Sequence, residues 1–301
     1  MKLAMLLHNP KAGDENHLAQ DIQHLIEDSG YECEYYSIKE EGWKKAMDKA
    51  DLIVVAGGDG SVRTIAKEMI TRGDNAKRSP LAILPMGTAN NLFRTLGVGK
   101  RRKDVMELVR GWNFSDKKSL DIGLIKMGDT EDFFIEGAGF GVFPKLIDAM
   151  RHLDKQASST KDGEVKLALS KLIEIVKTHP INHFQIETKE GQVKEIECFL
   201  LEVMNIKSVG PNLYLAPNLS ISNGYFDVVY ITQAERQRFI VYLQSLLEGQ
   251  PFVYPFNSIR TSELTIRTKA DQMMHVDDEL VKKGSAEITF MSKRGFLEFL
   301  P

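Results

Sequence analysis

Residues 52–61 have the sequence LIVVAGGDGS, an apolar run that ends in three glycines around the single carboxylate of Asp59. The apolar part predicts a buried parallel strand, because both of its faces are hydrophobic. Glycines after a strand can adopt positive φ and let a ligand approach backbone N–H groups, and the helix predicted at residues 62–70 points the positive end of its dipole at the same place. The run therefore predicts an anion cradle, with a phosphate as the expected anion.

Asp59 distinguishes this loop from an ordinary strand-to-helix turn. A single Gly-Gly pair would favour the ordinary turn. A buried aspartate among glycines, however, has little structural use and is well placed to hold a cation beside phosphates. The sequence GGDG at residues 57–60 therefore favours a phosphate site over a turn of purely structural importance.

Length and composition limit the classes of function. The chain has 301 residues, a net charge of −3 and no basic stripe interleaved with aromatic residues, which argues against a nucleic-acid partner. The cysteines, Cys33 and Cys198, are far apart and lack ligand spacing, so we expect neither a disulfide framework nor a zinc site, and a reducing cytoplasm fits. No stretch approaches 18 apolar residues and no cleavable signal is evident, so no membrane span is expected.

The first 118 residues alternate strands and helices. Such an alternation is typical of a doubly wound parallel sheet, in which ligands bind beyond the carboxyl ends of the strands. We therefore expect the loops at Asn9, Gly57 and Gly87 to converge on one crevice. The strands are predicted at residues 2–7, 32–37, 52–56 and 81–84, and the helices between and after them include segments at 40–49 and 103–111.

Strands dominate from Ser119 onward, which predicts a second, mostly antiparallel β-sandwich domain at residues 119–294. The final residues, 295–301, are apolar enough to pack back on the first domain, residues 1–118. The strands of the second domain are predicted at residues 119–126, 133–136, 181–188, 193–204, 226–231, 263–268, 272–276 and 286–291, and its helices at 143–153, 164–177 and 234–247.

Four further segments carry charged or glycine-rich motifs. The sequence GAGFG at residues 137–141 is a poor dinucleotide fingerprint, because its third glycine comes one place early, and we expect a tight turn there. Asp277-Asp278-Glu279 lies in a predicted turn, and composition alone favours a solvated hairpin tip. Asp121 is a carboxylate in an apolar strand and should have a partner. The basic run at residues 100–103 is either a solvated face or a contact for an anionic membrane surface.

The sequence GGDGS at residues 57–61, followed by LPMGTANNLFR at residues 84–94, resembles the paired signatures of the diacylglycerol kinase catalytic domain family. That family includes bacterial soluble lipid kinases and the sphingosine and ceramide kinases. The resemblance extends along nearly the whole chain, because other family motifs follow in the same order. They are NPKAG at residues 9–13, DIG at 121–123, GFG at 139–141, LAP at 215–217, NGYFD at 223–227 and DDE at 277–279.

This resemblance implies a lipid kinase that depends on ATP and Mg²⁺. It implies a phosphofructokinase-like, doubly wound α/β domain for the nucleotide, a β-rich domain for the lipid, and an active site in the cleft between them. Glu279 would be the general base, and Asp59 with Asp121 would organise Mg²⁺, since phosphoryl transfer needs charge neutralisation and a carboxylate near the attacking hydroxyl. The nucleotide would be contacted by Asn9, Pro10, Lys11, Ala12, Gly13, Gly57, Gly58, Asp59, Gly60, Ser61, Gly87, Thr88 and Asn90.

The chain departs from the family pattern at several positions. Arg63-Thr64 and Asn91 stand where many members carry a carboxylate near the metal, so two carboxylates are missing. Asn223 replaces a common aspartate, which counts against a structural magnesium in the second domain. Asp278 replaces a glycine, a change that aspartate tolerates because it adopts the left-handed conformation more readily than most residues.

We expect the acceptor to be diacylglycerol, a related acylglycerol or a long-chain base, met through peripheral contact with a membrane. An NAD kinase-like enzyme stays open as an alternative, although the sequence PMGTAN at residues 85–90 and the late DDE disfavour it. A non-catalytic pseudokinase that senses lipid or nucleotide also stays open, and retention of Asp59, Asp121 and Glu279 disfavours it. The expected location is the cytoplasm and, transiently, the inner membrane surface, and a homodimer is left open.

Overall fold

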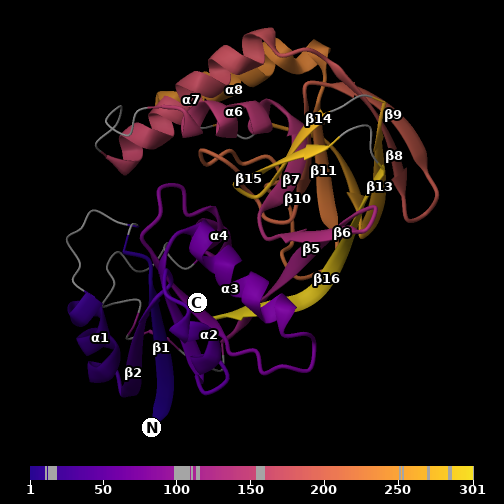
Figure 1. Ribbon diagram of the computed structural model, residues 1–301. Helices are drawn as coiled ribbons and strands as arrows, with labels where there is room; N and C mark the ends of the chain where they lie inside the picture. The colour runs from indigo at the N-terminus through magenta and orange to yellow at the C-terminus, as the bar shows by residue number, and fades with distance from the viewer. Residues whose placement is uncertain are drawn as a thin grey trace. The chain divides into compact units, whose positions relative to one another are not determined.

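The computed structural model describes residues 1–10, 12, 19–97, 109, 111–112, 116–153, 160–250, 252, 254–269, 272–283 and 287–300 (Figure 1). It divides into two compact units, Met1–Leu120 with Gly295–Pro301, and Asp121–Arg294. Strands β5 (Lys118–Met127) and β16 (Glu287–Phe299) contribute residues to both units. Most of the helix predicted at residues 103–111, and all of the basic run at 100–103, lie outside the described residues.

A parallel sheet with strand order β2-β1-β3-β4 forms the centre of the first unit. Every residue of β3 (Leu52–Gly57) is buried, as the apolar run predicts. The strand order reverses direction between β1 and β3, and open α/β sheets bind ligands at such a switch point. The other elements are β1 (Lys2–His8), β2 (Tyr31–Ser37), β4 (Leu81–Pro85), α1 (Ala19–Asp28), α2 (Gly42–Ala46), α3 (Asp59–Thr71) and α4 (Asn91–Leu96).

The end of the chain completes this sheet. Phe299 of β16 pairs in parallel with Leu81 of β4, and the Leu300 N–H donates to the Leu81 carbonyl at 2.8 Å. An ion pair of 2.8 Å between Lys117 and Glu298 joins the two segments that leave and re-enter the unit. Residues 295–300 therefore pack as part of the first unit.

Two sheets form the core of the second unit. One has six strands in the order β12-β11-β10-β7-β14-β15, paired antiparallel throughout, and the other contains β16, β13, β8 and β9 with the β5–β6 hairpin. The sheets bury an apolar cluster that includes Phe140 and Phe184. The strands are β6 (Thr130–Phe134), β7 (Gly137–Gly141), β8 (Asn182–Thr188), β9 (Val193–Cys198), β10 (Leu200–Met204), β11 (Phe226–Ile231), β12 (Asn257–Thr261), β13 (Glu263–Thr268), β14 (Gln272–Val276) and β15 (Glu279–Lys283).

Helices α6 (Val142–Arg151), α7 (Lys161–Thr178) and α8 (Arg236–Leu247) lie together over the six-stranded sheet (Figure 1). The short 3₁₀ turn η3 (Gln233–Glu235) precedes α8. Along β10, Leu200 and Met204 join the apolar cluster under these helices, whereas Leu201 and Val203 join the core between the sheets. Among the helices that the structure describes, none has the length and apolarity needed to cross a bilayer.

The structure confirms the fold class, an α/β domain followed by a mostly antiparallel β-sandwich, but corrects three predicted elements. The single strand predicted at residues 193–204 is two strands, because the chain changes sheets at Phe199. The tight turn predicted at Gly137–Gly141 is strand β7, inside the six-stranded sheet. The helix predicted at residues 40–49 is shorter, and strands β12 and β15 were not predicted.

Candidate functional site

The loops after β1 and β3 meet at the switch point of the first unit. The Asn9 N–H donates to the Ala56 carbonyl at 2.9 Å, and the Asn9 side-chain amide donates to Oγ of Ser61 at 3.3 Å. The Ala12 N–H donates back to the Asn9 carbonyl at 2.9 Å, so the loop after β1 turns at once. The loops at Asn9 and Gly57 therefore meet, as the sequence predicts, while Lys11 and Gly13 lie outside the described residues.

Gly58 and Gly87 bring the loops after β3 and β4 into direct backbone contact. A Cβ added to Gly58 would lie 2.9 Å from Cα of Gly87, and a Cβ added to Gly87 would lie 2.6 Å from Cα of Gly58. The positive φ that glycine permits is not used in these loops, because Gly58 has φ −102° and neither Gly57 nor Gly87 has positive φ. Glycine is required at positions 58 and 87 because the two backbones approach each other closely, and any side chain would block this contact.

Asn90 shapes the second loop. It adopts the left-handed conformation with φ 50°, its side-chain oxygen accepts the Gly87 N–H at 3.0 Å, and its side-chain amide donates to the Gly87 carbonyl at 2.7 Å. Thr88 is exposed at the tip of this loop. Asn90 therefore fixes the loop conformation, and Thr88 is the side chain that the loop presents to solvent.

Asp59 is the first residue of α3, three positions before the predicted helix start, and its carboxylate caps another helix. One carboxylate oxygen accepts the N–H of Asn91 at 2.9 Å and the other accepts the N–H of Leu92 at 3.2 Å, at the start of α4. These are N–H groups that a helix cannot satisfy internally, and a negative charge is favourable there. The premise that this aspartate has little structural use is therefore wrong.

The residues that depart from the family pattern, Arg63, Thr64 and Asn91, differ in burial and in their contacts. Arg63 is buried in α3, while Thr64 is exposed and its hydroxyl donates to the Gly60 carbonyl at 2.9 Å. Asn91 is buried at the start of α4. The described residues include no group of three or more His, Cys, Asp or Glu side chains that could hold a metal ion.

The donor set nevertheless fits Mg²⁺ held together with a nucleotide. The carboxylate oxygens of Asp59 accept the N–H groups of Asn91 and Leu92, and a carboxylate oxygen has two lone pairs. Mg²⁺ usually binds one or two carboxylates, phosphate oxygens and water rather than a full protein cage. A carboxylate such as that of Asp59, together with phosphate oxygens and water, is the kind of ligand set that Mg²⁺ prefers.

Asp121 belongs to the second unit and holds a loop of that unit. It is buried, one of its carboxylate oxygens accepts the Gly224 N–H at 2.6 Å, and its own N–H donates to the Ile221 carbonyl at 2.8 Å. Asn223 uses its side-chain oxygen to accept the Tyr225 N–H at 3.1 Å. The predicted partner of the Asp121 carboxylate is thus a backbone N–H, and the proposed pairing of Asp121 with Asp59 on one metal stays a prediction.

The acidic run 277–279 includes the tight turn between β14 and β15, which is formed by Asp277 and Asp278. The Asp277 carboxylate accepts the N–H groups of Ile135, Glu136 and Gly137 at 2.8 to 3.3 Å. Asp277, with φ 53°, is the left-handed residue, so the assignment of that conformation to Asp278 is wrong. The turn is anchored through Asp277 rather than being a freely solvated tip.

Glu279 follows this anchored turn as the first residue of β15, opposite Val276 of β14, and it is exposed. The guanidinium of Arg151 in α6 donates to the Asp278 carbonyl at 2.8 Å and fixes the turn from a second side. Glu279 thus presents an exposed side chain next to a turn whose backbone is held.

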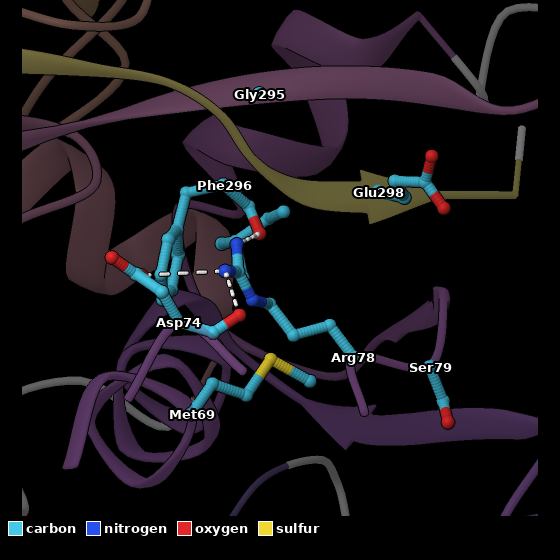
Figure 2. A pocket seen from close by; sticks show the side chains of 8 residues that line it. Met69, Asp74, Arg78, Ser79, Gly295, Phe296 and Glu298 are labelled. Atoms are coloured by element: carbon cyan, nitrogen blue, oxygen red, sulfur yellow. Dashed lines mark hydrogen bonds and ion pairs between the residues drawn. The ribbon is translucent and has the colours of Figure 1, made fainter. Parts of the chain in front are cut away.

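A pocket of about 270 Å³ in the first unit lies between α3, the segment before β4 and the end of β16. Figure 2 shows the Arg78 side chain pointing toward Phe296 and Asp74. Its guanidinium lies 4.4 Å from the Phe296 ring centroid and 3.3 Å from the Asp74 carboxylate. The polar groups of this pocket serve packing of the C-terminal segment, and none of the predicted site residues lines it.

Comparison with known families finds two matching models. Residues 3–125 match the diacylglycerol kinase catalytic domain, and residues 144–293 match the YegS C-terminal NAD kinase beta sandwich-like domain. The two matches follow the division of the chain into an α/β unit and a β-rich unit.

Individual relatives agree with these models. The diacylglycerol kinase of Bacillus subtilis (strain 168) is 29% identical over 260 residues, which cover 83% of this chain and 80% of that protein. A diacylglycerol kinase of Staphylococcus epidermidis is 24% identical over 294 residues, covering 92% and 86%. A solved structure of a diacylglycerol kinase from Bacillus anthracis str. Sterne superposes with a TM-score of 0.69 at 19% identity, covering 99% of this chain and 96% of that one, and this likeness concerns the fold.

Proposed function

Since this chain belongs to the diacylglycerol kinase catalytic domain family, we propose that it is a lipid kinase that transfers the γ-phosphate of ATP to a hydroxyl of diacylglycerol or a related lipid. The observation that carries this proposal is the pair of family matches, at residues 3–125 and 144–293, which together include the glycine loops and the late acidic turn. The names of the relatives, which are diacylglycerol kinases, support diacylglycerol as the acceptor.

In this proposal the nucleotide phosphates bind at the start of α3. Gly57, Gly58 and Gly87 let backbone approach the phosphates without a side chain in between, and α3, with 13 residues, points the positive end of its dipole toward them. Thr88 would contact the nucleotide from the tip of the second loop. Mg²⁺, when bound to Asp59 and the phosphates, would neutralise the charge of the phosphate oxygens.

Glu279 would act as the general base on the acceptor hydroxyl. The hydroxyl oxygen attacks the γ-phosphorus, its proton passes to the Glu279 carboxylate, and the bond from the γ-phosphorus to the β–γ bridging oxygen breaks to release ADP. The exposed position of Glu279 supports this assignment, because a lipid hydroxyl must reach the carboxylate. We further propose that the protein meets its lipid by peripheral contact with a membrane surface.

A phosphorylation assay tests the proposal. Wild-type protein, Glu279→Gln and Asp59→Ala would be incubated with labelled ATP and Mg²⁺ against diacylglycerol, monoacylglycerol, sphingosine and ceramide in mixed micelles, with NAD as a separate acceptor. We expect labelled lipid with the wild type, loss of product on addition of EDTA, and at least a 100-fold lower rate with Glu279→Gln.

Other outcomes would point to the alternatives. Phosphorylation of NAD but of no lipid would replace the proposal with a small-molecule kinase. ATP binding without transfer to any acceptor would indicate a nucleotide-sensing protein, which the missing carboxylates at Thr64 and Asn91 would then explain.

A further inference from the structure

A buried ion pair crosses the middle of the six-stranded sheet in the second unit. Nε2 of His275 on β14 lies 2.9 Å from Oε2 of Glu202 on β10, with the side chains 1% and 0% exposed. The two strands are not neighbours, because β7 runs between them. Glu202 and His275 both pair with Gly139 of β7, so the carboxylate reaches the imidazole by passing over that glycine.

The glycines of β7 make this crossing possible. A Cβ on Gly137 would lie 2.7 Å from Oε1 of Glu202, and a Cβ on Gly139 would overlap Oε2 of Glu202 and the Leu201 carbonyl. The alternate residues Ala138 and Phe140 point the other way, into the core between the sheets. The GAGFG motif has no part in the proposed reaction. Its glycines leave the space that the Glu202 carboxylate occupies.

The hydrogen bonds of His275 require an imidazolium ring, with a hydrogen on both Nδ1 and Nε2. Nδ1 lies 2.9 Å from the Asp277 carbonyl, which can only accept, so Nδ1 carries a hydrogen. A neutral ring would then turn the lone pair of Nε2 toward the Glu202 carboxylate. Burial lowers the pKa of His275, but the charge and hydrogen bond of Glu202 and the contacts with Asp277 outweigh it, so the pKa is raised above 6.5.

The described elements next to the pair carry one aromatic contact and several charged side chains. From α6, the ring of Phe143 contacts the imidazole edge-on at 5.8 Å, and Lys145, Asp148 and Arg151 of that helix are exposed or half-buried. On the turn and β15 the ionisable residues are Asp277, Asp278, Glu279, Lys282 and Lys283, and β7 carries none.

The pair is connected to the turn that carries Glu279. His275 binds the carbonyl of Asp277, and the Asp277 carboxylate in turn accepts the N–H groups of residues 135–137 that lead into β7. The Asp277 N–H donates to the Gly137 carbonyl at 2.9 Å. Both backbone groups of Asp277 are thus held: the His275 imidazole binds its carbonyl, and the Gly137 carbonyl at the start of β7 accepts its N–H.

This arrangement is a poor way to stabilise a sheet. Glycine weakens a strand, and a buried ion pair is often no more stable than apolar side chains of the same size. Oε1 of Glu202 is buried without a hydrogen-bond partner in the part of the chain that the structure describes, which adds a further cost. Local costs of this kind are expected where a structure serves a site.

We propose that Glu202 and His275 are positioning residues that hold the 277–279 turn in the conformation that presents Glu279 to the acceptor. This inference deepens the proposed function and rests on Glu279 acting as its base. The glycines at 137 and 139 are then part of the same device, because a side chain at either would separate Glu202 from His275.

The test compares Glu202→Gln and His275→Gln with the wild type and with Asp227→Asn. Asp227 is a matched control, since it is a buried carboxylate that pairs with Arg260 at 2.8 Å and lies on β11, separated from β14 by β10 and β7 in the same sheet. For Glu202→Gln we expect kcat to fall on the order of 10- to 100-fold with the KM for ATP little changed. The alkaline limit of activity should move to lower pH, because His275 loses its proton more easily beside an amide.

Two readouts do not depend on the reaction. Amide hydrogen exchange at residues 135–137 should be at least about tenfold faster in Glu202→Gln and His275→Gln but unchanged in Asp227→Asn. In the wild type, NMR titration of His275 should give a midpoint above 6.5. A wild-type midpoint below 6.5, or variants with unchanged exchange and pH profile, would overturn the proposal. If the wild type phosphorylates no lipid, the proposed function fails, whereas the exchange data still decide whether the pair holds the turn.

Discussion

Substituting Gly87 by alanine tests the close contact between the two glycine loops. The added Cβ would lie 2.6 Å from Cα of Gly58, whereas two carbons need about 3.5 Å, so the loops must separate by about 1 Å. Overpacking of this kind costs about 1 to 3 kcal/mol. The new Cβ would also lie 2.8 Å from the Asn90 side-chain oxygen, which strains two hydrogen bonds with Gly87 that contribute about 1 kcal/mol each.

We therefore expect Gly87→Ala to lower the free energy of unfolding of the first unit by about 2 to 4 kcal/mol. Both tryptophans of the chain, Trp43 and Trp112, lie in that unit, so tryptophan fluorescence in a urea titration reports its unfolding selectively. The urea midpoint should fall by about 1 to 2 M. ATP binding, measured by calorimetry, should weaken as well, because the loops that we propose to cradle the phosphates would move apart.

Gly42→Ala is the matched control for this substitution. A Cβ at Gly42 would meet no atom within 4 Å, and alanine is favoured over glycine inside a helix by up to about 1 kcal/mol. This variant should keep or raise the midpoint and leave ATP binding intact. If Gly87→Ala unfolds and binds ATP as the wild type does, or if Gly42→Ala is destabilised equally, close backbone contact is not the reason for glycine at position 87.

Two further predictions concern Asp59 and His179. Asp59→Ala removes a helix cap, so it should lower the free energy of unfolding of the first unit by about 1 kcal/mol and lower the urea midpoint. Asp59→Asn should also lower the midpoint, because a side-chain amide accepts hydrogen bonds only at its oxygen. Urea midpoints equal to that of the wild type would contradict the capping function. Burial and the charges of Lys145 and Arg236 lower the pKa of His179 to about 4, so the unfolded chain binds more protons between pH 6.5 and 4 and stability falls as the pH falls through that range. In thermal melts, His179→Gln should lose less stability than the wild type between pH 6.5 and 4. Equal losses in both proteins would refute the claim that protonation of His179 causes the loss.

The elements that the sequence predicted well are those whose cause is local. Strand β3 is an apolar run followed by glycines, and the loops at Asn9, Gly57 and Gly87 meet because parallel strands end at one edge of the sheet. Strand β7 was missed because its glycines have low β-propensity, and the reason for them is Glu202, more than 60 positions away. The break at Phe199 was missed because both halves have strand-like sequences and differ only in the sheet that they join.

The candidate site shows the same limit. The carboxylate of Asp59 was recognised as unusual, whereas composition favoured a solvated hairpin tip for Asp277. The N–H partners of the two carboxylates lie at residues 91–92 and 135–137. Which residue of the acidic turn is left-handed depends on those contacts, so Asp277 could not be distinguished from Asp278 by composition. Long-range partners of this kind leave no periodic signal in one sequence.

The presence of Asp59, Asp121 and Glu279 was the reason to disfavour a non-catalytic protein. The structure changes how strongly each of these residues argues for catalysis. Asp59 caps α4 and Asp121 holds the Gly224 N–H, so the fold would require both residues even in a protein without activity. Glu279 is exposed, and the turn before it is anchored by Asp277 rather than by Glu279 itself. Loss of activity in Asp59→Ala can therefore follow from a weakened first unit, whereas loss in a folded Glu279→Gln variant points to chemistry. Glu279→Gln is the variant that separates a kinase from a nucleotide-binding relative.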